Sequence, residues 1–368
     1  MLSHVAYIED DSLTAICSNI PNVKDRGKLV HRLVEAYGLF KFMKIFPVIP
    51  ASRDDLVSFH SQSYVDFLFE ANEWSDFEQR EDDQLEYGLG YDCPLFKNIY
   101  EFASLVAGGS LTAAKVLVDG DAQVAINWCG GWHHAQRDEA KGFCYVNDIV
   151  IAIHKLRERF DRVLYIDLDA HHGDGVENAF SFSPKVMTVS FHNYDLGFFP
   201  CSGAINEVGF GAGKYYSVNV PLKDGVTDEQ YSWLFTGVMD LVKTVFRSDA
   251  IVVQCGADCL TGDPVGTFNL TPHSLGVCVQ KVLSWQQPTL FLGGGGYNIT
   301  NTAKCWTFLT SLMVGQNLSS DIPDHPYFLR YGPDFDIEIS VGLRKNNNIP
   351  SDLKKIVDMI STNLSQIL

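Results

Sequence analysis

The sequence lacks the features of a secreted or membrane-anchored protein. Its nine cysteines are scattered among apolar residues and include no CxxC pair, whereas a secreted disulfide framework is short and dense in cysteine. The N-terminal residues MLSHVAYIEDD have neither a basic start nor an apolar signal core, and no uninterrupted apolar run is long enough to cross a bilayer. We therefore expect reduced thiols and a soluble, intracellular protein without a membrane partner.

Basic residues are also scarce. The 368 residues include 28 Lys plus Arg against 45 Asp plus Glu, which gives a net charge of −17. This balance excludes a surface that grips nucleic-acid phosphates or anionic lipid, and it favours a cationic partner. With 46% hydrophobic and 20% charged residues, the chain has enough apolar side chains for a large core, so disorder is excluded as its main state.

No Pro/Ser/Gly-rich linker and no internal repeat divides the chain, so we expect one domain over residues 1–368. The stretch 70–86 has eight acids against one base and is expected to be a solvated loop or helix end. Short apolar runs of strand length alternate with helical periodicity, as at 147–159 and 229–246, which predicts a mostly parallel sheet covered by helices on both faces. The predicted strands are 5–8, 46–49, 124–128, 163–167, 186–191, 217–220, 251–255 and 289–292.

Five of the predicted strands run directly into polar or glycine-rich motifs. These motifs are CGGWHHA, LDAHHGDG, the pair His192 and Asn193, GAD, and GGGGYN. In open α/β sheets, ligands bind just outside the carboxyl ends of the strands, so we expect motifs that are distant in sequence to converge there. Such convergence is a further argument for one domain.

A metal site is predicted from residue spacing after two strands. Asp167, Asp169 and His171 are spaced two apart, so on an extended segment their side chains lie on one side. Asp258 ends a different strand, and two carboxylates plus one imidazole leave a tetrahedral zinc ion with an open position. We expect Asp169, His171 and Asp258 to be the ligands; iron(II) would also fit these donors. The alternative is that they serve as helix caps or a buried ion pair, but the polar ends of neighbouring strands favour a site.

Two adjacent histidines, His133 and His134, follow a pair of glycines that permits close approach to a pocket. Histidine titrates in the range that an acid–base catalyst needs, and histidine pairs in satisfied cores are an equally good reading of these two residues alone. Asp167 and Asp174 are candidates to orient the two imidazoles.

The run Gly293–Gly296 lacks the Lys-Ser/Thr ending and the spacing of a phosphate loop. We expect a backbone that passes close to the site and delivers Tyr297 as a hydrogen-bond donor to a developing oxyanion; a tight turn with a packing tyrosine is the alternative. Phe143 and Phe199 sit beside glycines, and as facing rings they would grip an aliphatic chain, although most aromatics are core residues. Asp92 would then lie at the rim.

Several long segments together resemble the class I histone deacetylases, from about Ala6 to the C-terminus, and within that class the type-8 enzymes most. The resemblance implies a three-layer α/β/α sandwich around an eight-stranded, mostly parallel sheet, and zinc-dependent removal of acetyl groups from acetyl-lysine. The segments are WCGGWHHAQRDEAKGFCYVND, VLYIDLDAHHGDGVENAF, GFFP, QCGADCLTGDP, LGGGGYN and IPDHPYFLRYGPDF, with EYGLGYDCP, KVMTVS and YYSVNVP similar to the type-8 enzymes.

The resemblance also implies a role for each matching residue. The zinc ligands agree with the spacing argument; His134 would be the general base and acid, His133 electrostatic, Tyr297 the electrophile, and Asp167 and Asp174 the respective partners of His133 and His134. Gly142, Phe143 and Phe199 would line the acyl-lysine tunnel, with Asp92 at the rim and Arg26 at the pocket base near the acetate exit. Two potassium sites are implied, one using Asp167, Asp169, His171, Ser190 and Phe191, the other the carbonyls of Phe180, Ser183, Val186 and Tyr216.

Departures from the type-8 pattern lie at the pocket wall and rim. Val265 stands where a methionine is usual, which alters inhibitor and acyl-chain fit, and Cys201 follows GFFP where a glycine is usual, which stiffens the rim loop. The expected substrates are acetylated lysines of histones and of a cohesin subunit, with a nuclear and cytoplasmic distribution. Since no long tail follows Leu368, we expect activity without a corepressor complex.

Three other functions fit parts of the sequence. DAHHGD faintly resembles the DAHxD pattern of binuclear manganese ureohydrolases, but its second acid lies one residue further along and no second bridging pair accompanies Asp258. An acetylpolyamine deacetylase of the same superfamily would share fold and metal, and an acidic rim suits its substrate. A catalytically inactive scaffold is disfavoured because His134, Tyr297 and all three predicted ligands are present.

Overall fold

The computed structural model describes residues 5–72, 74 and 81–367. In this part of the chain eight strands form one sheet with the order β2-β1-β3-β8-β7-β4-β5-β6, and every neighbouring pair is parallel. The predicted α/β class is confirmed, and "mostly parallel" becomes fully parallel. The strands are β1 Val5–Ile8, β2 Lys44–Phe46, β3 Val124–Asn127, β4 Val163–Asp167, β5 Val186–Asn193, β6 Ser217–Leu222, β7 Ala250–Gln254 and β8 Thr289–Leu292.

The eighth strand exists, but its predicted position at 46–49 is wrong. β2 covers Lys44–Phe46 and pairs with β1, Ile8 lying opposite Phe46. The next residue, Pro47, has no N–H to give to the ladder, and the N–H of Val48 instead donates to the Asp10 carboxylate at 3.2 Å. The strand therefore ends where the apolar run FPVI begins.

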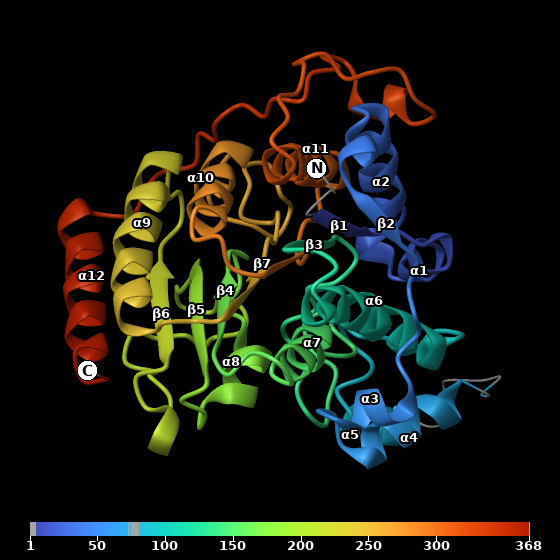
Figure 1. Cartoon of the computed structure of the whole chain (residues 1–368), viewed down its shortest axis with the longest axis horizontal. Coiled ribbons are helices and arrows are strands. Elements are labelled where there is room, and N and C mark those ends of the chain that lie inside the picture. Colours follow the sequence, from blue (N-terminus) through green and yellow to red (C-terminus); the bar gives the residue numbers. More distant parts are fainter. Residues whose placement is uncertain (1–4, 73, 75–80, 368) are drawn as a thin grey trace.

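Helices cover both faces of the sheet (Figure 1). One hydrophobic core joins a face of the sheet to α2, α9, α10, α11 and α12, and a second core joins the opposite face to α1, α4, α6 and α7. The predicted three-layer arrangement follows from these two cores. The helices are α1 Asp11–Cys17, α2 Arg26–Ala36, α3 Arg53–Val57, α4 Gln62–Ala71, α5 Glu81–Glu86, α6 Ile99–Asp119, α7 Asp148–Leu156, α8 Asp174–Phe180, α9 Asp228–Val245, α10 Pro272–Leu283, α11 Ile299–Met313 and α12 Pro350–Leu364.

Local sequence sets the helix ends that border the strand-end loops. Asn147 caps α7 by accepting from the N–H of Val150, and Asn298 caps α11 by accepting from the N–H of Asn301. α7 is shorter than the predicted 147–159 because Arg157 already forms its C-cap. In the acidic stretch 70–86, Glu81–Glu86 form α5, while residues 73 and 75–80 lie outside the described part.

Among the described residues, one helix, α6, is long and apolar enough to cross a membrane by length and composition alone. However, 72% of its most apolar window is buried inside the protein, where α6 packs against α7. We therefore assign α6 to the core. The nine cysteines are all free thiols, and Cys201 is the exposed one.

Candidate active site and metal centre

Four adjacent strands, β3, β8, β7 and β4, deliver the predicted site residues to one edge of the sheet. β3 leads to His133 and His134, β8 to Tyr297, β7 to Asp258, and β4 to Asp169 and His171. The expected convergence is confirmed for these four motifs. The fifth motif behaves differently, because His192 and Asn193 remain within β5.

The two side chains of that fifth motif form hydrogen bonds with residues outside the pocket. His192 is hydrogen-bonded to Ser190 and to the carbonyl of Gly203, and Asn193 donates to Asp224 and Thr267. Both are buried in the sheet because β5 continues two residues beyond the apolar run.

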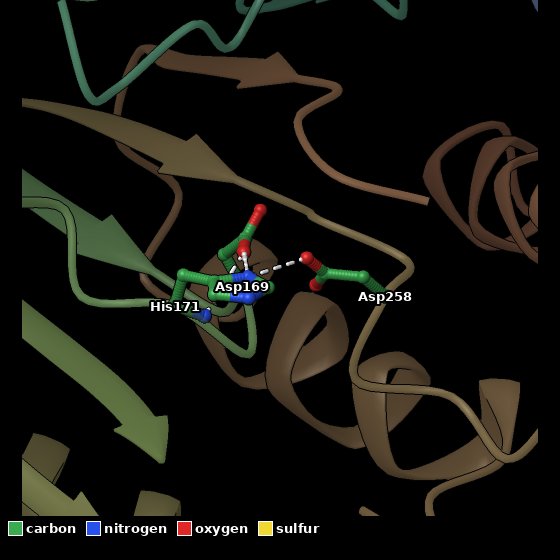
Figure 2. Close-up of side chains that lie close together, drawn as sticks. All are labelled: Asp169, His171 and Asp258. Atoms are coloured by element: carbon green, nitrogen blue, oxygen red, sulfur yellow. Dashed lines mark hydrogen bonds and ion pairs between the residues drawn. The ribbon is translucent and has the colours of Figure 1, made fainter. Parts of the chain in front are cut away.

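Asp169, His171 and Asp258 each place one ligand atom within 4.8 Å of the others (Figure 2). Nδ1 of His171 lies 2.8 Å from Oδ2 of Asp258 and 3.2 Å from Oδ1 of Asp169. The remaining carboxylate oxygens are held from behind: Oδ2 of Asp169 accepts from Gln254 Nε2 and from the N–H of Gly295, both at 2.8 Å, and Oδ1 of Asp258 accepts from the N–H of Ala170 at 2.9 Å. Oδ1 of Asp169, Oδ2 of Asp258 and Nδ1 of His171 are therefore the atoms that lie together and could hold an ion.

Electrostatics also favour a cation between these side chains. Burial, and secondarily the Asp169 carboxylate beside it, raise the pKa of Asp258 to about 7. Two buried carboxylates that face one another are costly without a positive charge. Burial lowers the pKa of His171, but Asp258 and Asp169 outweigh it and raise that pKa to about 10, so the imidazole supplies the charge here, and a bound divalent ion would take its place. The donor set of two oxygens and one nitrogen fits a metal ion.

The two histidines differ in protonation. Nδ1 of His133 lies 2.7 Å from Asp167, and Nδ1 of His134 lies 2.8 Å from Asp174. Burial lowers the pKa of His133, but the charges of Asp167 and Asp169 outweigh it and raise that pKa to about 9. Burial and the neighbouring His133 lower the pKa of His134 to about 3 despite its bond to Asp174. At neutral pH His133 is therefore the cation and His134 the neutral imidazole.

A pocket of about 230 Å³ opens above the cluster. Three residues of the strand-end motifs, His134, His171 and Tyr297, belong to its lining. A Cβ built on Gly142 would lie 2.9 Å from the Phe199 ring, so only glycine fits opposite that ring. The predicted substrate residues in the lining are Asp92, Gly142, Phe143, Phe199 and Val265.

Close passage of the glycine run is confirmed. A Cβ on Gly295 would lie 2.2 Å from the Asp258 carboxylate, so the backbone can pass here only without a side chain. Arg26, at the start of α2, is buried and donates to the carbonyl of Gly296 at 3.0 Å, with its guanidinium 5.0 Å from the Trp306 ring centre. Arg26 therefore contacts the backbone just before Tyr297, although it is not part of the pocket lining.

The residues of the two implied potassium sites lie on neighbouring segments. Asp167 and Ser190 are register partners in β4 and β5. For the more remote set, the N–H of Ser183 donates to the carbonyl of Phe180, and the carbonyl of Tyr216 accepts from Thr188 in the strand that begins at Val186.

Comparison with known proteins identifies the family. The chain matches the histone deacetylase domain over residues 20–313. The chain belongs to the histone deacetylase family. It is 50% identical to histone deacetylase 8 of Xenopus tropicalis over 98% of both chains, and 48% identical to histone deacetylase 8 of Danio rerio over 99% of this chain and 96% of that protein. It is 43% identical to human histone deacetylase 1 over 94% of this chain and 72% of that protein. The chain is thus a histone deacetylase, a hydrolase that acts on acetylated lysine.

Several residues that shape the site were not predicted. Asp148 accepts from the N–H groups of Gly131 at 2.9 Å and Trp132 at 2.8 Å and from Ser110, and so holds the loop before the histidines. Gln254 holds Asp169, as described above. Gln254 could have been noticed as a polar residue ending an otherwise apolar strand, whereas Asp148 resembles an ordinary acid in the first turn of a helix.

Proposed function

We propose that the chain hydrolyses the acetyl amide of acetyl-lysine in histones and other proteins at a single zinc ion. The observation that carries this proposal is the Asp169, His171 and Asp258 cluster, which shares His171 with a pocket that Phe143 and Phe199 also line. A pocket of this kind suits an extended aliphatic side chain that ends in a small amide.

Zn²⁺ would be held by Asp169, His171 and Asp258, and when bound it would supply Lewis acidity to the acetyl carbonyl and to water. Fe²⁺ fits the same donors. Gln254 and Gly295 would fix the Asp169 carboxylate toward the ion.

The chain's own residues would carry out the proton transfers. His134 is neutral, so it can take the proton of the attacking water, and it would then give that proton to the departing lysine amine. Asp174 would hold His134 in the correct tautomer, and His133, kept cationic by Asp167, would stabilise negative charge. The hydroxyl of Tyr297 would donate to the oxygen of the tetrahedral intermediate.

Substrate binding would use the outer pocket. Phe143 and Phe199 would flank the lysine stem beside Gly142, Val265 would form the wall, and Asp92 would accept from the substrate backbone at the rim. Asp92 is positioned by the N–H of Gly142, which donates to it at 2.7 Å. Arg26 would lie on the acetate exit path at the base.

The remaining assignments extend this proposal. Potassium would bind at the two sets of residues named above and stabilise the strand ends. We propose one catalytic domain over residues 1–368, with activity that does not depend on a corepressor complex. Histones and a cohesin subunit are the proposed substrates, in nucleus and cytoplasm.

The test is deacetylation of an acetyl-lysine peptide by the purified, zinc-loaded chain, beside an acetylated polyamine at equal concentration. The polyamine is included because a protein with a net charge of −17 would also attract that cation. We expect preference for the peptide, and preference for the polyamine would contradict protein deacetylation. Tyr297→Phe is expected to lower kcat about 10²- to 10³-fold while metal content stays at one ion per chain. Near-normal turnover in that variant would contradict the role of Tyr297.

A further inference from the structure

Asp263 lies in the loop after β7 and joins two separate segments through four backbone hydrogen bonds. Its Oδ1 accepts from the N–H of Val265 at 3.0 Å and of Gly266 at 3.3 Å. Its Oδ2 accepts from the N–H of Tyr297 at 2.7 Å and of Asn298 at 3.1 Å. The side chain is 5% exposed, so these bonds form largely out of contact with water.

The two segments that Asp263 joins carry different parts of the pocket. Val265 and Tyr297 both line the pocket, but Asp263 itself is not in the lining. Tyr297 follows four consecutive glycines, with Gly294 at φ +146° and Gly296 at φ +132°. Glycine restrains the backbone least, so the run cannot by itself fix where Tyr297 points.

We propose that Asp263 is a positioning residue: its carboxylate fixes the backbone of Tyr297 and locks it to the Val265 wall, so that the hydroxyl is held where the oxyanion develops. This inference rests on the proposed function and adds to it a residue that acts only through Tyr297. It also links transition-state stabilisation to the wall that contacts the acyl-lysine.

Only a carboxylate can make all four hydrogen bonds at this position, because each of its two oxygens accepts from two backbone N–H groups. Asparagine of the same size has one oxygen, so Asp263→Asn can satisfy either the Val265 pair or the Tyr297 pair and must turn its NH₂ group toward the other. We expect kcat to fall about 10- to 100-fold, a fraction of the loss on removing an oxyanion donor altogether, with KM changed less than about threefold.

A double-mutant cycle with Tyr297→Phe separates positioning from general support of the fold. In the Tyr297→Phe background, Asp263→Asn is expected to change kcat less than about twofold, since the hydroxyl it positions is already gone. An equal loss in both backgrounds, or no loss in either, would overturn the proposal. Asp10→Asn is the matched control. The Asp10 carboxylate also joins two segments, since it accepts from the N–H groups of Ser12, Leu13 and Val48, and none of these residues lines the pocket.

A spectroscopic readout makes the test independent of turnover. With 3-fluorotyrosine incorporated, the ¹⁹F resonance of Tyr297 is the one that Tyr297→Phe removes. We expect one narrow line in the wild-type chain and a shifted, broadened or split line in Asp263→Asn, with Asp10→Asn unchanged; an unaltered line would refute positioning. If the wild-type chain fails to deacetylate the peptide, the proposed function fails while this readout still decides on Asp263. Should Asp263→Asn not fold, Asp263→Glu, which keeps all acceptors but displaces them, replaces it in the same cycle.

Discussion

Replacing Asp174 by asparagine is expected to disable His134 by reversing its tautomer. Oδ1 of Asp174 lies 2.8 Å from Nδ1 of His134, while Oδ2 accepts from Lys141 Nζ at 2.6 Å and Gln136 Nε2 at 3.1 Å. Burial alone would raise the pKa of Asp174, but His134 and Lys141 hold that pKa well below its usual value. An amide in this place has one oxygen for three donors.

The geometry sets which way the amide turns. A hydrogen bond to a charged donor contributes about 1.5–3 kcal/mol and a neutral one about 1 kcal/mol. We take the lower end for Lys141 because its side chain is 32% exposed. Lys141 and Gln136 together then outweigh His134 by about 1.5 kcal/mol, which is roughly a tenfold preference for the oxygen to face them. The NH₂ group then donates to Nδ1 of His134, which places the ring proton on Nε2 and blocks it as a base.

We expect Asp174→Asn to lower kcat about 10²- to 10³-fold: about tenfold from the tautomer population, and the rest from the lost negative charge that stabilises the protonated imidazole. Adding Lys141→Met removes the charged donor and leaves Gln136 and His134 evenly matched, so about half of the molecules regain the working orientation. The double variant should therefore be about fivefold faster than Asp174→Asn alone. The assay is steady-state deacetylation of the peptide with zinc content measured, and Lys141→Met alone as the control. A double variant no faster than Asp174→Asn would refute the tautomer argument.

Three further predictions concern stability. Burial lowers the pKa of His60 to about 4, and the His60 ring accepts a hydrogen bond from the N–H of Asn147. Because the unfolded chain binds this proton at a higher pH, the free energy of unfolding should fall by roughly 3 kcal/mol as the pH drops from about 6.5 to about 4. His60→Gln should flatten this part of the stability profile, and an unchanged slope would contradict the assignment. Gly131 has φ +99°, and a Cβ on it would lie 2.4 Å from the carbonyl oxygen of Gly293, so Gly131→Ala should sharply lower Tm. Gly237 lies within α9 with open space around it, so Gly237→Ala should raise the free energy of unfolding by about 0.5–1 kcal/mol. Equal effects of the two substitutions would refute the steric argument. Removing the metal with a chelator should lower Tm, with Zn²⁺ restoring about 4 kcal/mol at a thousandfold excess over Kd, and a Tm that ignores metal would count against the site.

The sequence predicts the metal cluster well because its logic is local. Asp169 and His171 lie two residues apart in the bend just after β4, and Asp258 follows the end of β7 by four residues. The carboxyl ends of parallel strands share an edge, so convergence follows from the fold class alone.

Other features depend on contacts that a one-dimensional pattern does not contain. β2 is an edge strand whose side chains are largely exposed, so no apolar run marks it. Asp148 and Asp263 act on backbone N–H groups of distant loops, and a backbone partner leaves no trace in side-chain identity. The strand order, with β8 between β3 and β7, depends on long-range packing for the same reason.

That central place of β8 has a consequence during synthesis on the ribosome. Until Thr289–Leu292 has been made, no strand can join the half of the sheet with β2, β1 and β3 to the half with β7, β4, β5 and β6. Each half presents an open, apolar edge, which is a template for aggregation. The same late strand leads directly to Tyr297, so the site cannot be completed before β8 has been made and placed between β3 and β7.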